Sequence, residues 1–245
     1  MFVEWEAKQS GLTKEDFGVT PIVVLTWSLR TAQALAKEID AKIPTHWPYG
    51  ERFPIYSGRV LDRAVSFAYV PIGAPGTVIM MEEMIACGAR TLIGLGWAGS
   101  LQENIRVGSF LVPTSCVCEE GTSRHYLDQE TSVTPSSRLV EIIRNLCEKE
   151  GIKTEAGPVW TTDAPYREFV SKIKRYNQQG VLAVDMETSA MYALGKSRQV
   201  DVCNLLVVSD ELLREWKPAF RSPELDDANG KARQIILKIL AKENL

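Results

Sequence analysis

Long hydrophobic runs and an excess of charge of one sign are both missing from this chain of 245 residues. No apolar stretch approaches the roughly 18–20 residues that span a bilayer, so we expect no membrane partner. Lysine and arginine total 28 against 31 acidic residues, a net charge of −3 that argues against a nucleic-acid partner. The N-terminus carries Glu4 and Glu6 where a signal peptide has basic residues, so we expect a cytoplasmic protein.

Histidine and paired cysteine are also scarce. The two histidines, His46 and His125, are far apart in the sequence, so a His-rich metal site is not available. The five cysteines are scattered, odd in number and without the C-x-x-C spacing of zinc or redox sites. Cys116 and Cys118 are interpreted as two small apolar residues on a strand. The sequence therefore predicts no metal site.

Apolar segments rich in β-branched residues alternate with amphipathic segments along the chain. The patterns predict strands at 21–26, 64–70, 91–96, 107–119, 157–162, 181–184 and 202–209. They predict helices at 29–43, about 77–87, 136–150, 187–195 and 225–244. The loop 211–227, which contains Trp216, is the best candidate for a lid. This alternation predicts one α/β domain over residues 1–245, with a central, mixed but mostly parallel twisted sheet flanked by helices.

Four short segments follow predicted strands and are candidates for a common site. They are residues 73–77, 94–100, 185–188 and 209–211. Ligands of open α/β sheets bind beyond the carboxyl ends of the strands. Glycine turns let backbone N–H groups approach an anion, although turns that only pack a helix on a sheet look the same. The glycines at 94, 96 and 99 are one residue short of dinucleotide-binding spacing, so no dinucleotide is predicted.

Two acidic residues at these strand ends are the candidate chemical groups. Glu187 opens a predicted helix, where its carboxylate could accept hydrogen bonds from a sugar diol or serve only as a first-turn acid. Asp210 follows a strand, where a partly buried carboxyl could donate a proton or act only as a cap or turn residue. The residues alone leave both alternatives open in each case.

Several segments, in this order, resemble the nucleoside phosphorylase family of the uridine phosphorylase and hexameric purine nucleoside phosphorylase type. The resemblance runs from about Ile22 to Leu240. It implies a phosphorylase-type α/β fold, usually assembled as a homo-oligomer of dimers. It also implies phosphorolysis of the N-glycosidic bond of a ribonucleoside, preferably a purine one, with phosphate as co-substrate and no metal or redox cofactor. The segments that carry it are Gly96-Trp97-Ala98-Gly99-Ser100, Glu120-Gly121-Thr122-Ser123-Arg124-His125-Tyr126, Val184-Asp185-Met186-Glu187-Thr188 and Leu205-Leu206-Val207-Val208-Ser209-Asp210.

The resemblance further implies roles for individual residues. The departing base would need a hydrogen bond or a proton, and the ribosyl cation would need nearby negative charge. Trp160 is equally interpretable as a core aromatic residue at a strand end. The implied assignments are Asp210 and Arg221 for catalysis, Met186 and Glu187 for ribose, Arg30, Arg52 and Gly96 for phosphate, and Trp160, Pro165, Tyr166 and Ser209 for the base.

The chain departs from the family pattern in its phosphate-binding segments. Gly94 stands where an arginine is usual, Trp97 where a hydroxyl residue is usual, and Thr26-Trp27-Ser28 where the family has Gly-Asp-Pro. Charge-assisted hydrogen bonds contribute about 1.5–3 kcal/mol each, so losing two would weaken phosphate binding strongly. A nucleosidase, which uses water in place of phosphate, and a nucleoside-binding sensor without turnover are therefore the alternatives.

Overall fold

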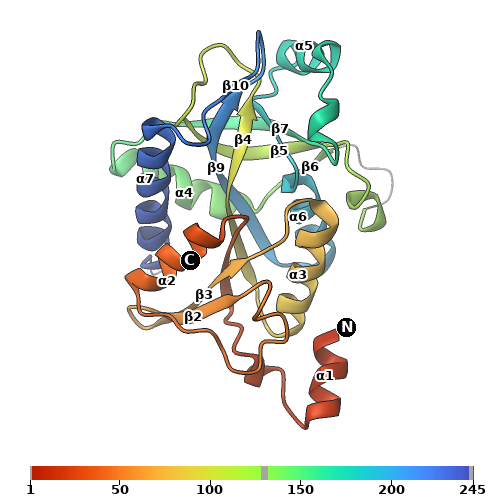
Figure 1. Cartoon of the computed structure of the whole chain (residues 1–245), viewed down its shortest axis with the longest axis vertical. Helices are drawn as coiled ribbons and strands as arrows, with labels where there is room; N and C mark the ends of the chain where they lie inside the picture. The colour runs from red at the N-terminus through yellow and green to blue at the C-terminus, as the bar shows by residue number, and fades with distance from the viewer. Residues whose placement is uncertain (1, 128–131, 243–244) are drawn as a thin grey trace.

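A ten-stranded sheet forms the centre of the computed structural model, which describes residues 2–127, 132–242 and 245 (Figure 1). The strands are β1 (Ile22–Thr26), β2 (Ile55–Val60), β3 (Arg63–Tyr69), β4 (Thr91–Ser100), β5 (Phe110–Cys118), β6 (Ser132–Val133), β7 (Thr154–Thr161), β8 (Ala183–Asp185), β9 (Asp201–Glu211) and β10 (Lys217–Pro218). Their order is β10-β9-β5-β7-β8-β4-β1-β3-β2, with β6 beside β5 and β9 also paired with β4. Parallel pairs join β1 to β3 and β4, β4 to β9, and β7 to β5 and β8, and the other pairs are antiparallel. The predicted α/β fold with a mixed sheet is confirmed.

Helices cover both faces of this sheet, which explains why its strands are apolar on both sides. They are α1 (Phe2–Ser10), α2 (Leu29–Glu38), α3 (Ala74–Ala86), α4 (Ser137–Lys149), α5 (Val170–Gln178), α6 (Thr188–Arg198) and α7 (Pro223–Leu240), with short 3₁₀ turns η1 (Glu15–Phe17), η2 (Ser123–His125) and η3 (Pro165–Arg167). Figure 1 shows α2, α4 and α7 on one side and α3 and α6 on the other.

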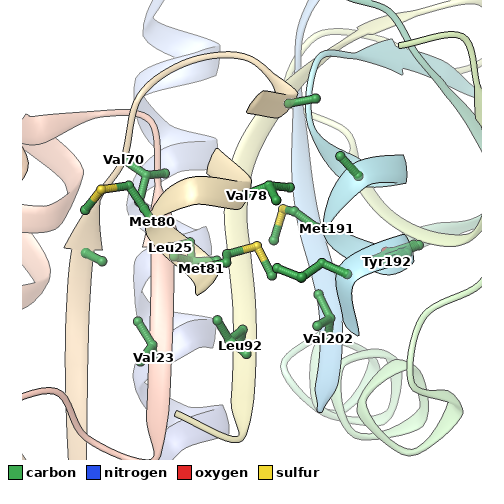
Figure 2. Packing of buried hydrophobic residues seen from close by; sticks show 14 of the residues in the cluster. Val23, Leu25, Val70, Val78, Met80, Met81, Leu92, Met191, Tyr192 and Val202 are labelled. Carbon is green, nitrogen blue, oxygen red and sulfur yellow. The ribbon is translucent and has the colours of Figure 1, made fainter. Parts of the chain in front are cut away.

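Strand β1 shows how one segment serves two cores. Val23 and Leu25 pack with methionines of α3 and α6, as Figure 2 shows. Ile22 and Val24 point to the opposite face and pack against α2 and α7. Because side chains alternate along a strand, this continuous apolar run fills both cores at once.

The glycine-rich segment after residue 94 differs from the prediction. We expected a small-residue turn at 97–100, but β4 continues as a strand to Ser100. A Cβ at Gly94 would lie 2.2 Å from Asn204 Oδ1, and one at Gly96 would lie 2.7 Å from the Trp27 ring. Because these glycines have no side chain, Asn204 and the Trp27 ring pack directly against the strand. The glycines do not form a turn.

Other differences concern the ends of predicted elements and several elements that the sequence did not predict. Helix α2 ends at Glu38, earlier than expected, and the predicted helix end at Asn244 lies outside the described residues. The segment 211–227 contains the end of β9, all of β10 and the start of α7, so the expected loop is shorter. We did not predict the helices α1 and α5 or the strands β2, β6 and β10. Helix α1 is fastened by Glu83 of α3, whose carboxylate accepts the backbone N–H groups of Phe2 (3.1 Å) and Val3 (3.0 Å).

All five cysteines are buried and none forms a disulfide, and Cys116 and Cys118 lie on a strand, β5, as predicted. Burial raises the pKa of the Cys147 thiol to about 11 and those of Cys87 and Cys203 to about 12. In the part of the chain that the structure describes, no helix is long and apolar enough to cross a membrane. Nor do three or more metal-ligating side chains gather within those residues.

Candidate active site

A cavity of about 920 Å³ opens where β1, β4, β8 and β9 end. Three of the four segments predicted to form a common site contribute directly to its wall, through residues 95–99, 185–187 and 209–210. The fourth borders it, because Ile72 lines the cavity and the backbone of Gly73 contacts Glu187. The parallel arrangement of β1, β4 and β9 is what brings segments so far apart in sequence to one edge.

Glu187 lies in the cavity wall directly before helix α6. It is buried, and its Oε1 accepts the Gly73 N–H at 2.6 Å. Burial raises the pKa of Glu187 to about 8, and the negative charge of Asp185 adds to this shift, while the backbone N–H groups of Gly73 and Met186 oppose it. Hydroxyl donors in the cavity would favour the ionised form of Glu187, because its carboxylate keeps acceptor positions beyond the one that the Gly73 N–H uses.

Asp185 fixes the start of α6 and so the position of Glu187. The Thr161 hydroxyl donates to its Oδ1 at 2.6 Å, and the Thr188 N–H donates to its Oδ2 at 3.0 Å. The Thr188 hydroxyl also donates to Oδ2 and in turn accepts from Asn204 Nδ2 at 2.7 Å. Burial raises the pKa of Asp185. Sequence reasoning did not assign this residue a role, although an Asp three residues before a Thr at a helix start is a capping pattern.

Asp210 lies in the wall formed by β9. Its Oδ1 accepts the Ser209 hydroxyl at 2.7 Å, and its Oδ2 accepts the Trp216 Nε1–H at 2.9 Å. Residue 218 of β10 pairs with Asp210, so the hairpin that carries Trp216 is fastened beside the carboxylate. Both oxygens of Asp210 therefore act as hydrogen-bond acceptors.

The structure separates the residues assigned through the resemblance into two groups. Gly96, Pro165, Tyr166, Met186 and Ser209 line the cavity together with Glu187 and Asp210. The cavity wall does not include the other four, Trp160, Arg30, Arg52 and Arg221.

Of the four residues outside the cavity wall, one lies in the core and three lie at the surface. Trp160 is fully buried in the core, with its ring centroid 4.9 Å from that of Tyr176, so it is the core aromatic of the two alternatives. Arg30, Arg52 and Arg221 are exposed to solvent. Arg30 lies in the first turn of α2, next to Ser28 and Thr31, which do line the cavity.

The end of the cavity near Gly96 has little positive charge. The Trp27 indole covers Gly96 and donates its Nε1–H to Thr77 Oγ1 at 2.9 Å. Among the described residues of the cavity wall, Arg214 is the only cation, and it pairs with Glu103 at 2.8 Å. Thr26, Ser28 and Thr31 are the hydroxyl-bearing residues of the cavity wall nearest in sequence to Trp27.

Aromatic residues of β4 and of the segment between β9 and α7 form a further wall that sequence reasoning missed. The Trp97 and Phe220 ring centroids are 6.1 Å apart, and those of Trp216 and Phe220 are 6.5 Å apart. Trp97 also donates its Nε1–H to Asn229 Oδ1 at 2.9 Å. Flat aromatic faces beside two carboxylates suit a flat heterocycle attached to a polyol.

The fold and the site define an α/β protein with a large cavity where the strands end. The phosphorylase superfamily matches residues 21–241, and the chain belongs to this superfamily. The resemblance noted in the sequence is confirmed.

Individual relatives support the same family. A DeoD-type purine nucleoside phosphorylase of Alkaliphilus metalliredigens is 31% identical over 160 residues, which cover 64% of this chain and 69% of the relative. A uridine phosphorylase of Treponema pallidum is 28% identical over 209 residues, 81% of this chain and 80% of the relative. Both relatives are pentosyltransferases. The crystal structure of uridine phosphorylase from Vibrio fischeri ES114 has the same fold, with a TM-score of 0.81 at 23% identity and coverage of 92% and 93% of the two chains.

Proposed function

We propose that this protein cleaves the N-glycosidic bond of a ribonucleoside, preferably a purine one, with inorganic phosphate as the acceptor. The observation that carries the proposal is that Glu187 and Asp210 line one cavity whose wall also has aromatic faces. Glu187 and Met186 would bind the ribose, and Asp210, Ser209, Pro165 and Tyr166 would surround the base. Carboxylates near the sugar favour the positive charge that develops on it as the bond breaks.

Phosphate would bind at the end of the cavity next to α2. Ser28 is the N-cap of this helix and accepts the Thr31 N–H at 3.2 Å. A helix N-terminus favours an anion, and Ser28, Thr31 and the Gly96 backbone would add neutral contacts. We also propose that the protein is cytoplasmic and forms a homo-oligomer. In this assembly Arg52 would contribute to the phosphate site of a neighbouring subunit.

Hydrolysis is the second candidate function, and a specific observation favours it. Trp27 occupies the space over Gly96, and Gly94 has no room for the arginine usual in phosphorylases. Water is small and neutral, so it needs neither the space nor the positive charge that phosphate requires.

A product assay separates these functions. A panel of ribonucleosides is incubated with the protein, with and without inorganic phosphate, and free base, ribose and ribose 1-phosphate are quantified. Free base and ribose 1-phosphate that appear only with phosphate support the proposal. Equal base release without phosphate, together with free ribose, would replace it by hydrolysis. A nucleoside-induced rise in melting temperature without any product would replace it by a sensor.

Arg30→Met tests the phosphate end of the cavity. The Arg30 side chain is exposed beside Ser28 and Thr31, and in the proposed complex it would turn onto the bound phosphate. A charge-assisted hydrogen bond contributes about 1.5–3 kcal/mol, so we expect the KM for phosphate to rise about 10- to 150-fold with little change in the KM for nucleoside. Lys37→Met is the matched control, because Lys37 is an exposed cation in the last turn of the same helix. An unchanged phosphate KM in the Arg30 variant would remove Arg30 from the site.

A further inference from the structure

The carboxyl group of Glu168 lies in the cavity wall, and neither the sequence patterns nor the resemblance assigned a role to it. It follows η3 directly and precedes α5 by two residues. The Arg167 N–H donates to the Ala164 carbonyl at 2.8 Å, and the Phe169 N–H donates to the Arg167 carbonyl at 2.9 Å. These backbone bonds hold the segment on either side of Glu168, so its side chain extends into the cavity wall from a fixed position.

The surroundings of Glu168 differ from those of Asp210, although both line the same cavity. Asp210 accepts hydrogen bonds from Ser209 and Trp216. No residue that the structure describes donates a hydrogen bond to Glu168 or forms an ion pair with it. Burial raises the pKa of Glu168 to about 7, and the negative charge of nearby Asp210 adds to the shift. Two carboxyl groups in one cavity with such different environments are suited to different roles.

A group that can donate a proton to the base assists the cleavage of an N-glycosidic bond. When the bond between C1′ and the base nitrogen breaks, its electron pair stays on the base, and the base leaves more readily if it receives a proton. Near neutral pH a substantial fraction of Glu168 carries a proton, whereas the oxygens of Asp210 already accept from fixed donors. An unpartnered O–H in the cavity can reach a ring nitrogen or carbonyl of the base without first breaking a protein contact.

We propose that Glu168 is the general acid that donates a proton to the leaving base, and that Asp210 binds the base as an acceptor. This inference rests on the proposed function. The C1′–N bond breaks, its electrons go to the base, and the Glu168 proton passes to the base. The acceptor oxygen of phosphate or water forms the new bond to C1′ and releases its own proton to solvent. The Glu168 carboxylate then takes up a proton from solvent.

The pH dependence of Glu168→Gln tests this role. A general acid acts only when protonated, so the kcat/KM of the wild-type protein should fall as the pH rises through about 7. Glutamine has no proton to transfer at any pH. We therefore expect kcat/KM for a purine ribonucleoside to fall about 10²- to 10⁴-fold, and the decline at alkaline pH to disappear.

A substrate that needs no acid separates catalysis from structure. With p-nitrophenyl β-D-riboside, whose phenolate leaves without protonation, Glu168→Gln should retain nearly all of the wild-type activity. Glu211→Gln is the matched control, because Glu211 follows Asp210 on β9 but pairs with Arg106 at 2.6 Å and does not line the cavity. It should retain both the activity and the pH profile of the wild-type protein.

The possible outcomes distinguish the acid from the proposed function. If the wild-type protein cleaves nucleosides and Glu168→Gln is equally active, or loses equal activity on both substrates, Glu168 is not the acid. If the wild-type protein cleaves no nucleoside, the proposed function itself is wrong. Asp210→Asn gives an independent check, because removing the charge beside Glu168 should move the alkaline decline of the remaining activity to lower pH. An unmoved decline would contradict the coupling of the two groups.

Discussion

Glu187→Gln is expected to lower kcat/KM for a ribonucleoside by about 10²- to 10⁴-fold and to leave the fold intact. Two charge-assisted hydrogen bonds to ribose hydroxyls contribute about 1.5–3 kcal/mol each, and each factor of ten corresponds to about 1.4 kcal/mol. Glutamine has the same size and keeps an oxygen for the Gly73 N–H, which lies 2.6 Å from Glu187 Oε1. Steady-state kinetics and thermal unfolding of the two proteins measure both parts of this expectation.

A comparison of two sugars tests directly whether Glu187 binds the ribose hydroxyls. A 2′-deoxyribonucleoside offers one hydroxyl fewer, so the loss caused by Glu187→Gln should be smaller with it. Glu83→Gln is the control, because Glu83 is also a buried carboxylate that accepts backbone N–H groups but lies outside the cavity wall. It should lower the melting temperature and leave the kinetics unchanged. Equal losses of Glu187→Gln on both sugars would contradict a role in ribose binding.

Gly94→Ala is expected to lower the free energy of unfolding by about 1–3 kcal/mol, the usual cost of overpacking a core. The new Cβ would lie 2.2 Å from Asn204 Oδ1 and 3.1 Å from the Met191 methyl group. Asn204 is fully buried and donates to Thr188 Oγ1 at 2.7 Å, so it cannot move freely. Because Thr188 also holds Asp185, a shifted Asn204 would disturb the residues beneath Glu187. An arginine at position 94 is therefore incompatible with this core.

Gly230→Ala is the matched control for this substitution. Gly230 lies inside helix α7, where a new Cβ would meet only the end of the Arg233 side chain, at 3.9 Å. Alanine is favoured over glycine in a helix by about 0.8–1 kcal/mol, so this variant should be more stable than the wild-type protein. Urea unfolding of the three proteins gives the comparison. A Gly94 variant as stable as the wild-type protein would show that the core can accommodate the extra methyl group.

The sheet could be predicted because its strands have short apolar runs between glycine, proline and charged residues. Ile22–Thr26 and Asp201–Glu211 were recognised in this way, although the second is longer than expected. The strand character of residues 97–100 was missed because Gly96 and Gly99 usually indicate a turn. Their function is a close approach to Trp27 and Leu212, which are distant in sequence. Such a contact has no local pattern.

The candidate site was only partly predictable for a related reason. Asp210 lies at the end of β9 and Glu187 lies two residues after β8, and the topology places these strand ends at one edge. Glu168 instead follows a 3₁₀ turn, and only the folded chain brings it near Asp210. The three arginines were assigned by resemblance alone, and the side chain of each lies in solvent. Glu187 and Asp210 thus line the cavity, whereas the three arginines do not.

The rate at which the buried cysteines react with a thiol reagent measures how often the folded chain opens. The thiolate form of a cysteine attacks a thiol reagent, and all five cysteines are buried in the folded protein. Labelling therefore requires a transient opening that exposes a cysteine, and its rate follows the free energy of that opening. Cys203 lies on β9 beside Asn204, whereas Cys147 lies on α4. Mass spectrometry of the labelled peptides would thus measure, without any added probe, whether the sheet beneath the cavity opens separately from the helix that covers it.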